Sequence, residues 1–450
     1  MDQIYLMTSI FNRFFKPAET PDGQPNIKFG RYSDSYKNAK QYNAWDKALV
    51  AFEKERYLDC YRAFFKYLRD EKEDNLKFWE ANHGIHFELL QGSKKVVGFA
   101  DRKQFKAEAK VVKVERLDLK LMKRLSTANF DLKYSRYALD NEQDITILFD
   151  TYTLDGSPYK LYYALKELAT NADKQDDLLV EEFEKIHPAD TDHLQPLADL
   201  EKEVKYTFIK KQIEYVLTEV NHGELKPNEY PGAIAYLFLD LTYKLDYLTK
   251  PEGFMMESLE RIHRLYFTNN KEDTHNKNEI LKKEFEALFS RTKDDYFREM
   301  YEVPATFGIT SPVNHDKIAS FIDAELHNMD WYQEQGHEQI ALAIPSYIVG
   351  YSLFYYAVPK PAQSLFHLYF QIIENDYFQS LGYPTEYYHN ATQKFNTKNI
   401  KCAIKNIVTE NRYKYLRLSP DLGQLNFSSL PAFAKSFLMM VRDLDMAKID

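Results

Sequence analysis

The sequence predicts an α+β protein, with an N-terminal two-layer domain of antiparallel sheet and helices followed by an all-helical domain. Between residues 85 and 111, apolar and polar side chains alternate, as expected for strands that are covered on one face. Leucines recur every three or four residues after position 117 and again after position 161, which indicates amphipathic helices. From Leu200 onward, helical spacing is almost continuous. We therefore expect three parts: residues 1–40, 41–195 and 196–450.

Composition and charge narrow the class of protein. A chain of 450 residues is long enough for more than one domain, and 44% hydrophobic with 28% charged residues is typical of soluble globular proteins. The formal charge of -9 has the wrong sign for a nonspecific nucleic-acid binder, so we expect no nucleic-acid partner. Cys60 and Cys402 form neither a disulfide framework nor a zinc spacing, which favours a reducing, cytoplasmic location.

One apolar segment raises the question of a membrane span. Residues 340–358 carry no charge and are long enough to cross a bilayer. They contain Pro345 and Gly350 and lack flanking basic clusters. We expect a helix that is buried inside a bundle, and no membrane partner. The N-terminal residues do not have the pattern of a signal peptide.

The first 72 residues predict a helix, a loop and further helix. A short helix is expected in the first 15 residues, and Pro, Gly, Asp and Asn gather in residues 16–30, as in a loop or linker. Apolar residues three and four apart in 41–72 predict a single helix or a helical hairpin. One tetratricopeptide-like pair fits this stretch, but no second copy follows at the required period.

The next 120 residues predict strands and helices in a defined order. Gly156-Ser157-Pro158 combines a turn, an N-cap and a proline at the first helical position. The predicted elements are strands at 85–89, 96–100 and 105–111, a helix with Leu117, Leu121 and Leu125, strands at 131–139 and 143–151, and a helix from 158 that continues to about 186.

Asp140, Asn141, Glu142 and Asp144 raise the alternative of a calcium loop. Such a loop requires a glycine at its sixth position and a glutamate at its twelfth. Counted from Asp140, these positions hold isoleucine and threonine. Alternation continues on both sides of the acidic residues, and Asp and Asn tolerate the backbone angles of a tight turn. The stretch therefore predicts the turn of a β-hairpin.

The order of elements between residues 41 and 190 resembles the class I type III secretion chaperone fold. Residues 124–179 look like the second half of that fold, and they are also similar to the YbjN-like family of proposed bacterial sensory-transduction regulators. The shared features are an N-x-x-L-like strand at 129–132, an L-D-x-acidic turn at 139–142, an aliphatic strand at 145–149 and a leucine-spaced helix at 161–173. The resemblance covers about a third of the chain and concerns packing, so it bears on fold more than on function.

The first functional hypothesis is a non-catalytic adaptor or chaperone-like protein. The resemblance implies a domain that binds other polypeptides through sheet and helix surfaces, often as a dimer. Leu117, Leu121 and Leu125, or the strand at 105–111, would then contact the partner; ordinary amphipathicity assigns the same residues to the core. This hypothesis requires no cofactor and no catalytic residue.

The alternative hypothesis is a metal-dependent enzyme in the helical domain. On one helix, Asp323, His327 and Asp330 would share a face, and His337 follows shortly after, which could form a metal site or an acid-base pair. The known H-E-x-x-H motif is absent, so the group also fits a solvated helix face. No G-x-S-x-G motif or glycine-rich phosphate loop is present.

Overall fold

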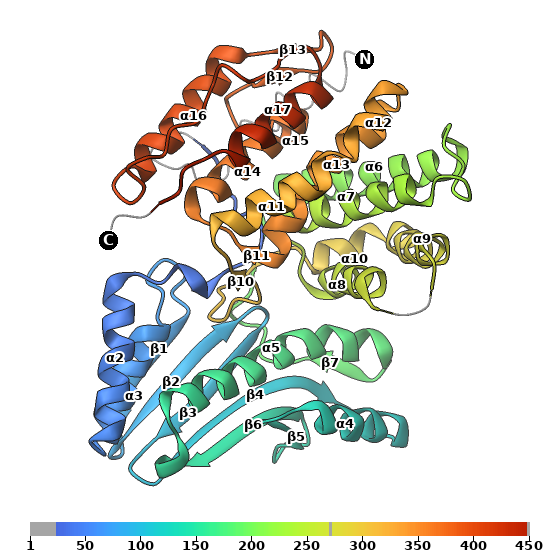
Figure 1. The fold of residues 1–450 in the computed structure, drawn as a ribbon. Coiled ribbons are helices and arrows are strands. Elements are labelled where there is room, and N and C mark those ends of the chain that lie inside the picture. The colour runs from blue at the N-terminus through green and yellow to red at the C-terminus, as the bar shows by residue number, and fades with distance from the viewer. Residues whose placement is uncertain (1–23, 270–271, 448–450) are drawn as a thin grey trace.

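The computed structural model describes residues 24–269 and 272–447. The helix expected in the first 15 residues lies outside the described residues. The protein is an α+β protein that combines helices with an antiparallel sheet. In Figure 1 the sheet and its helices form the lower part of the molecule, called the sheet region here (residues 39–188), and the other helices form the upper part, the helical region (residues 199–442).

The sheet region begins with a helical hairpin and continues with strands and two further helices. Its elements are α2 (Ala39–Glu53), α3 (Tyr57–Leu68), β1 (Leu76–Ala81), β2 (Gly84–Gln91), β3 (Lys94–Ala100), β4 (Gln104–Val114), α4 (Leu119–Asp131), β5 (Arg136–Leu139), β6 (Ile145–Tyr152), α5 (Pro158–Glu182) and β7 (Ile186–Pro188). The strand order is β1-β2-β3-β4-β6-β5, and β7 pairs with the end of β4.

All pairs in this seven-stranded sheet are antiparallel, and helices cover one of its faces. Along β2 and β4 every second side chain is buried, including Phe87 and Phe105, and the residues between them remain partly accessible. The buried side chains share one hydrophobic core with α2, α3, α4 and α5. The alternation in the sequence therefore predicted the covered face correctly.

Residues 41–72 form the helical hairpin of α2 and α3, one of the two alternatives predicted from the sequence. Two details differ from the sequence prediction. The first is β1, a strand that the sequence analysis did not predict. The strand expected at 131–139 is shortened to β5, because the N–H groups of residues 133–135 donate to the Glu167 carboxylate and are thus unavailable for strand pairing.

The helical region is an irregular bundle. Its helices are α6 (Asp199–His222), α7 (Pro231–Thr249), α8 (Gly253–Phe267), α9 (Thr274–Ser290), α10 (Lys293–Arg298), α11 (His315–Leu326), α12 (Met329–Glu334), α13 (Glu338–Tyr355), α14 (Lys360–Ile373), α15 (Asn375–Ser380), α16 (Thr397–Asn411) and α17 (Leu430–Arg442). Two-residue strands pair β8 (Gln195–Pro196) with β9 (Tyr301–Glu302), β10 (Ser311–Pro312) with β11 (Tyr356–Ala357), and β12 (Tyr388–His389) with β13 (Lys394–Phe395).

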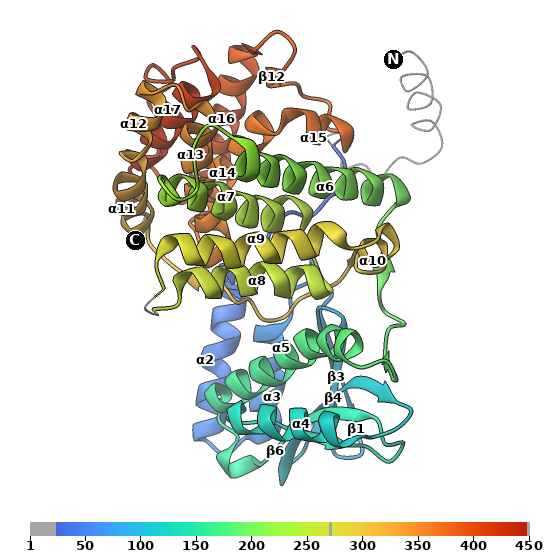
Figure 2. The same ribbon diagram turned by 90° about the vertical axis from the view of Figure 1, so that its right-hand side faces the viewer.

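The helices α7 and α13 pack against each other and are buried almost throughout. Figure 2 shows α7 between α6 and α9. Helices α7 and α13 approach closely at Gly350, where an added Cβ would lie 2.7 Å from the Cβ of Tyr243. α13 contains most of the apolar segment at 340–358, which is buried as predicted. Within residues 24–269 and 272–447, no helix has both the length and the apolar character needed to cross a membrane.

Residues 24–37, called the N-terminal strap here, run between the two regions. The N–H of Gly30 donates to the Tyr247 carbonyl at 2.8 Å. The Phe29 ring lies among aromatic rings of the helical region, with His367 5.1 Å and Phe378 5.2 Å away between centroids. The described part of the segment predicted as a loop or linker, residues 24–30, is therefore packed against helices.

Candidate functional site

The acidic turn at residues 140–144 is a hairpin turn, as predicted. The Asp140 carboxylate accepts hydrogen bonds from the N–H groups of Glu142 and Asp144, at 2.8 and 2.9 Å, and so closes the turn between β5 and β6. The three carboxylates are close enough to hold a cation. The ammonium of Lys110 lies 3.0 Å from Asp140, 2.9 Å from Glu142 and 3.6 Å from Asp144. The protein thus supplies its own cation there.

Millimolar calcium chloride should leave the thermal midpoint of the protein unchanged, because the ammonium of Lys110 already lies between the three carboxylates of this turn. Differential scanning fluorimetry across a calcium titration measures this. The variant for comparison is Lys110→Ala. In calcium-free buffer its free energy of unfolding should be less than about 1 kcal/mol below that of wild type, since the ion pairs of Lys110 are largely solvated. A saturable, calcium-dependent rise of the wild-type midpoint would contradict the assignment.

The acidic residues of the proposed metal cluster bind basic side chains of α17. Asp323, on α11, lies 2.8 Å from a guanidinium nitrogen of Arg442. Asp330, on α12, forms an ion pair with Lys435. Both acids therefore have cationic partners on a helix more than a hundred residues later, and they hold α11 and α12 to α17.

The two histidines of the proposed cluster do not converge on one site. His327 is exposed at the end of α11, where its Nδ1 is 3.5 Å from the carbonyl oxygen of Asp323. The Nδ1 of His337 is 3.7 Å from a carboxylate oxygen of Glu224. Among the described residues, three or more potential metal ligands come close together at the turn of Asp140, Glu142 and Asp144. That turn contains none of the four residues of the proposed cluster.

The leucine stripe considered for partner contact belongs to the hydrophobic core. Leu121 and Leu125 are 1% and 8% exposed, and Leu117 packs against the same core. On β4, Phe105 and Ala107 are buried in this core as well. These side chains therefore have the core position that ordinary amphipathicity assigned to them, because the sheet and its helices cover them.

The open face of the sheet instead presents a different set of side chains. Trp79 on β1 is 46% exposed, and its ring stacks on His86 of β2 with 5.9 Å between ring centroids. Phe99 on β3 follows at 6.2 Å from the histidine ring. A shallow groove of about 330 Å³ lies over these strands and is bordered by Lys106 and Glu108. Within the described residues β1 pairs with β2 alone, so this groove lies beside a sheet edge.

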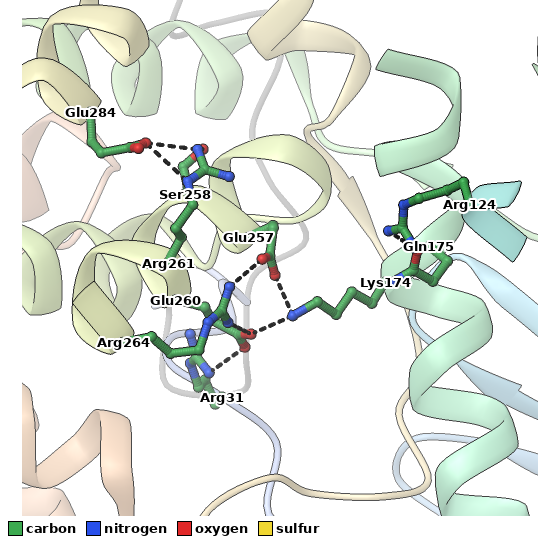
Figure 3. A network of polar contacts seen from close by, with 10 residues as sticks. All are labelled: Arg31, Arg124, Lys174, Gln175, Glu257, Ser258, Glu260, Arg261, Arg264 and Glu284. Carbon is green, nitrogen blue, oxygen red and sulfur yellow. Dashed lines mark hydrogen bonds and ion pairs between the residues drawn. The ribbon is translucent and has the colours of Figure 1, made fainter. Parts of the chain in front are cut away.

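A second candidate area is the junction between the sheet region and the helical region. Figure 3 shows Lys174 of α5 reaching across to α8, where its ammonium lies 2.5 Å from a carboxylate oxygen of Glu257 and 3.5 Å from one of Glu260. Arg264 of α8 pairs with both of these glutamates. The network ties the two regions together by charge.

Arg31 of the strap joins the same network. Its guanidinium binds Asp246 through Nε at 2.9 Å and Nη2 at 2.6 Å, and Glu260 through Nη1 at 2.9 Å. It also lies over the Phe354 ring, 3.9 Å from the centroid. Burial alone would raise the pKa of Glu260, but Arg31 and Lys174 outweigh burial and hold that pKa below its ordinary value.

Aspartates gather on the side of α5 that faces the helical region. Asp176 binds the ammonium of the fully buried Lys94 at 2.7 Å. Among residues 24–269 and 272–447, no basic side chain forms an ion pair with Asp177. Burial, together with the nearby Asp176, Glu299 and Asp173, raises its pKa well above the ordinary value. Deprotonation of Asp177 therefore opposes folding.

Asp177→Asn should make the protein more stable at pH 7.5 and leave its stability nearly unchanged near pH 4. A carboxyl whose pKa is raised by folding stabilises the protein below its unfolded pKa of about 3.9, and this contribution is lost as the pH rises toward the raised value. Thermal midpoints of wild type and variant between pH 4 and 8 measure the effect, with Asp376→Asn as the exposed control. Equal midpoints at every pH would contradict the pKa direction.

Comparison with known proteins finds no matching family model and no matching curated protein.

The sequence reading missed both of these areas. Trp79 follows a charged stretch, and the inward Leu76 and Phe78 give only two alternations before the next turn. Those alternations, with one of the three tryptophans of the chain on the outward position, are the signal that could have identified the strand. Arg31 stands in a segment rich in turn residues, and nothing in its immediate sequence indicates burial.

Proposed function

We propose that the protein is a non-catalytic polypeptide-binding protein, an adaptor or chaperone-like protein, and that the edge strand β1 with the neighbouring open face holds an extended segment of its partner. The observation that carries this proposal is Trp79, a large aromatic side chain exposed beside a groove at a sheet edge. Exposed aromatic side chains of this kind are typical anchors of protein interfaces.

The chemistry of this surface suits a peptide backbone. The outer edge of β1 offers N–H and C=O groups that an added strand can pair with. Alternate side chains of such a strand would point toward the open face, where Trp79, His86 and Phe99 provide an apolar contact. Lys106 and Glu108 border that contact with opposite charges, which favours a partner with both polar and apolar residues.

The order of elements supports the resemblance to type III secretion chaperones and to YbjN-like domains as part of this proposal. A helical unit, strands, a helix, two strands and a helix follow one another, with β1 and β7 as additions. The resemblance would also imply a dimer in solution. The two free cysteines, Cys60 and Cys402, support the proposed cytoplasmic location.

Selection from a random peptide library tests the proposal. The full-length protein should enrich peptides that carry an aromatic or large aliphatic residue, and the enriched peptides should bind Trp79→Ser at least tenfold more weakly. Tyr413→Ser is the matched control, since Tyr413 is 79% exposed in the helical region and should not affect binding.

Two results would refute this assignment. One is a library in which no peptide is enriched over the immobilisation control. The other is a set of enriched peptides that bind wild type and Trp79→Ser equally, because binding would then occur elsewhere on the protein.

A further inference from the structure

A cavity of about 480 Å³ lies at the junction of the two regions. Its wall is built from the strap, the β2–β3 turn, α5, the start of α8 and the segment after β9. The apolar part of the wall includes Phe29, Met256, Val303 and Phe307. This volume is within the range of sites that bind small molecules.

Asp173 of α5 faces this cavity. It is enclosed by protein but keeps part of its surface accessible, as expected for a side chain at an internal cavity wall. Its Oδ1 accepts hydrogen bonds from the N–H and the hydroxyl of Ser93, at 2.7 and 3.3 Å. Gly92 makes this approach possible, because an added Cβ would lie 1.9 Å from Oδ1. Within the described chain, no lysine or arginine forms an ion pair with Asp173.

The other charged groups of the wall already have partners. Glu252 pairs with Lys250 at 3.3 Å, Lys28 pairs with Glu73 at 3.1 Å, and Lys174 pairs with glutamates of α8. Arg31 is held by Asp246 and Glu260, as described above. Asp173 is therefore the carboxyl group of this wall that lacks a cation, and Glu252 and Asp176 add further negative charge close to it.

We propose that the cavity binds a small organic cation, a protonated amine with an apolar body, and that Asp173 is its counter-ion. The ammonium group would donate to the carboxylate of Asp173, and the apolar body would lie against Phe29, Met256 and Phe307. An anion could form no ion pair with Asp173 and would be repelled by the carboxylate of Glu252. A neutral molecule would leave Asp173 as the neutral acid and would gain no ion pair.

The proposal includes a proton-linked step. Burial, Glu252 and Asp176 raise the pKa of Asp173 well above its ordinary value, so the empty site favours the neutral acid. When the protonated amine binds, the Asp173 O–H bond breaks, the proton leaves to buffer, and the carboxylate pairs with the ammonium. The titratable and charged groups facing Asp173 are Glu252 at the start of α8, Asp176 and Asp177 on α5, and Tyr301 on β9. Affinity should therefore rise with pH, by up to about tenfold per unit.

Isothermal titration calorimetry of the full-length protein with 2-phenylethylamine tests the proposal. The neutral 2-phenylethanol and the anionic 3-phenylpropionate are the matched probes. The amine should bind at least tenfold more tightly than the alcohol, the anion should not bind, and titrations in buffers of different ionisation enthalpy should detect proton release.

Three variants locate the site. Asp173→Asn, which retains the Oδ1 acceptor for Ser93, should weaken amine binding at least tenfold and abolish proton release. Ala305→Phe should block the site by filling the cavity, and the exposed Asp376→Asn should bind like wild type. Absence of amine binding to the folded wild type would overturn the proposal, as would binding that Asp173→Asn leaves unchanged.

Discussion

Replacing Arg31 with alanine should lower the free energy of unfolding by about 3–5 kcal/mol, because the variant leaves the carboxylate of Asp246 buried without its counter-ion. The Asp246 side chain is 3% exposed and receives three hydrogen bonds from two nitrogens of the Arg31 guanidinium. Arg31→Lys keeps the charge but loses the paired geometry, so it should fall between wild type and Arg31→Ala. Urea unfolding followed by circular dichroism measures all three proteins.

Arg417→Ala is the control for this experiment. The Arg417 side chain is 78% exposed and lies 3.8 Å from Asp445, so its removal should change the free energy of unfolding only slightly. If Arg31→Ala lowers the free energy of unfolding no more than Arg417→Ala does, the ion pairs of Arg31 do not stabilise the protein in the way that the structure indicates.

Phe65→Ala should lower the free energy of unfolding by about 3–5 kcal/mol, as expected when a large aromatic side chain is removed from a packed core. Phe65 of α3 is fully buried, and its ring lies 4.7 Å from that of Phe87 and 5.5 Å from that of Phe78, between centroids. The substitution would weaken the packing of α3 against the covered face of the sheet. Hydrogen exchange should therefore accelerate most in β1 and β2.

Tyr152→Ala gives the matched comparison, because Tyr152 belongs to the same region and is 76% exposed. Its free energy of unfolding should stay within about 0.5 kcal/mol of wild type. A small loss for Phe65→Ala, or faster exchange confined to α6–α17, would contradict the described packing of α3.

The parts of the fold that could be predicted are those set by local pattern. Alternation at 105–111 predicted which residues of β4 are buried. Gly156-Ser157-Pro158 predicted the start of α5, where the Ser157 hydroxyl accepts a hydrogen bond from the N–H of Lys160. The hairpin at 140–144 was predicted for the same reason, since its turn residues and strand alternation lie within one short stretch.

The parts that could not be predicted depend on distant residues. Lys94 stands in the polar stretch Ser93-Lys94-Lys95, but it is fully buried because Asp176 and the carbonyls of Val111 and Ala189 surround its ammonium. Arg31 is buried because of Asp246, far along the chain. These pairings bring together residues from different helices and strands, and no local pattern of hydrophobicity encodes them.

The candidate sites show the same distinction. Spacing alone placed Asp323, His327 and Asp330 on one helix face, whereas α11 ends before His327 and α17 supplies cations to both aspartates. Sequence spacing could indicate neither the end of that helix nor the partner helix. The sequence analysis overlooked Trp79 as a candidate binding residue. Its exposure follows from the position of β1 at the edge of the sheet, which local sequence does not reveal.

Hydrogen-exchange mass spectrometry with a library-selected peptide shows whether the open sheet face beside β1 binds a polypeptide, as proposed. Exchange should slow in β1, β2 and β3 when the peptide is bound, with little change in α6–α17. It should not slow in Trp79→Ser at the same peptide concentration. Protection confined to the helical region, with β1 unchanged, would refute binding at this face.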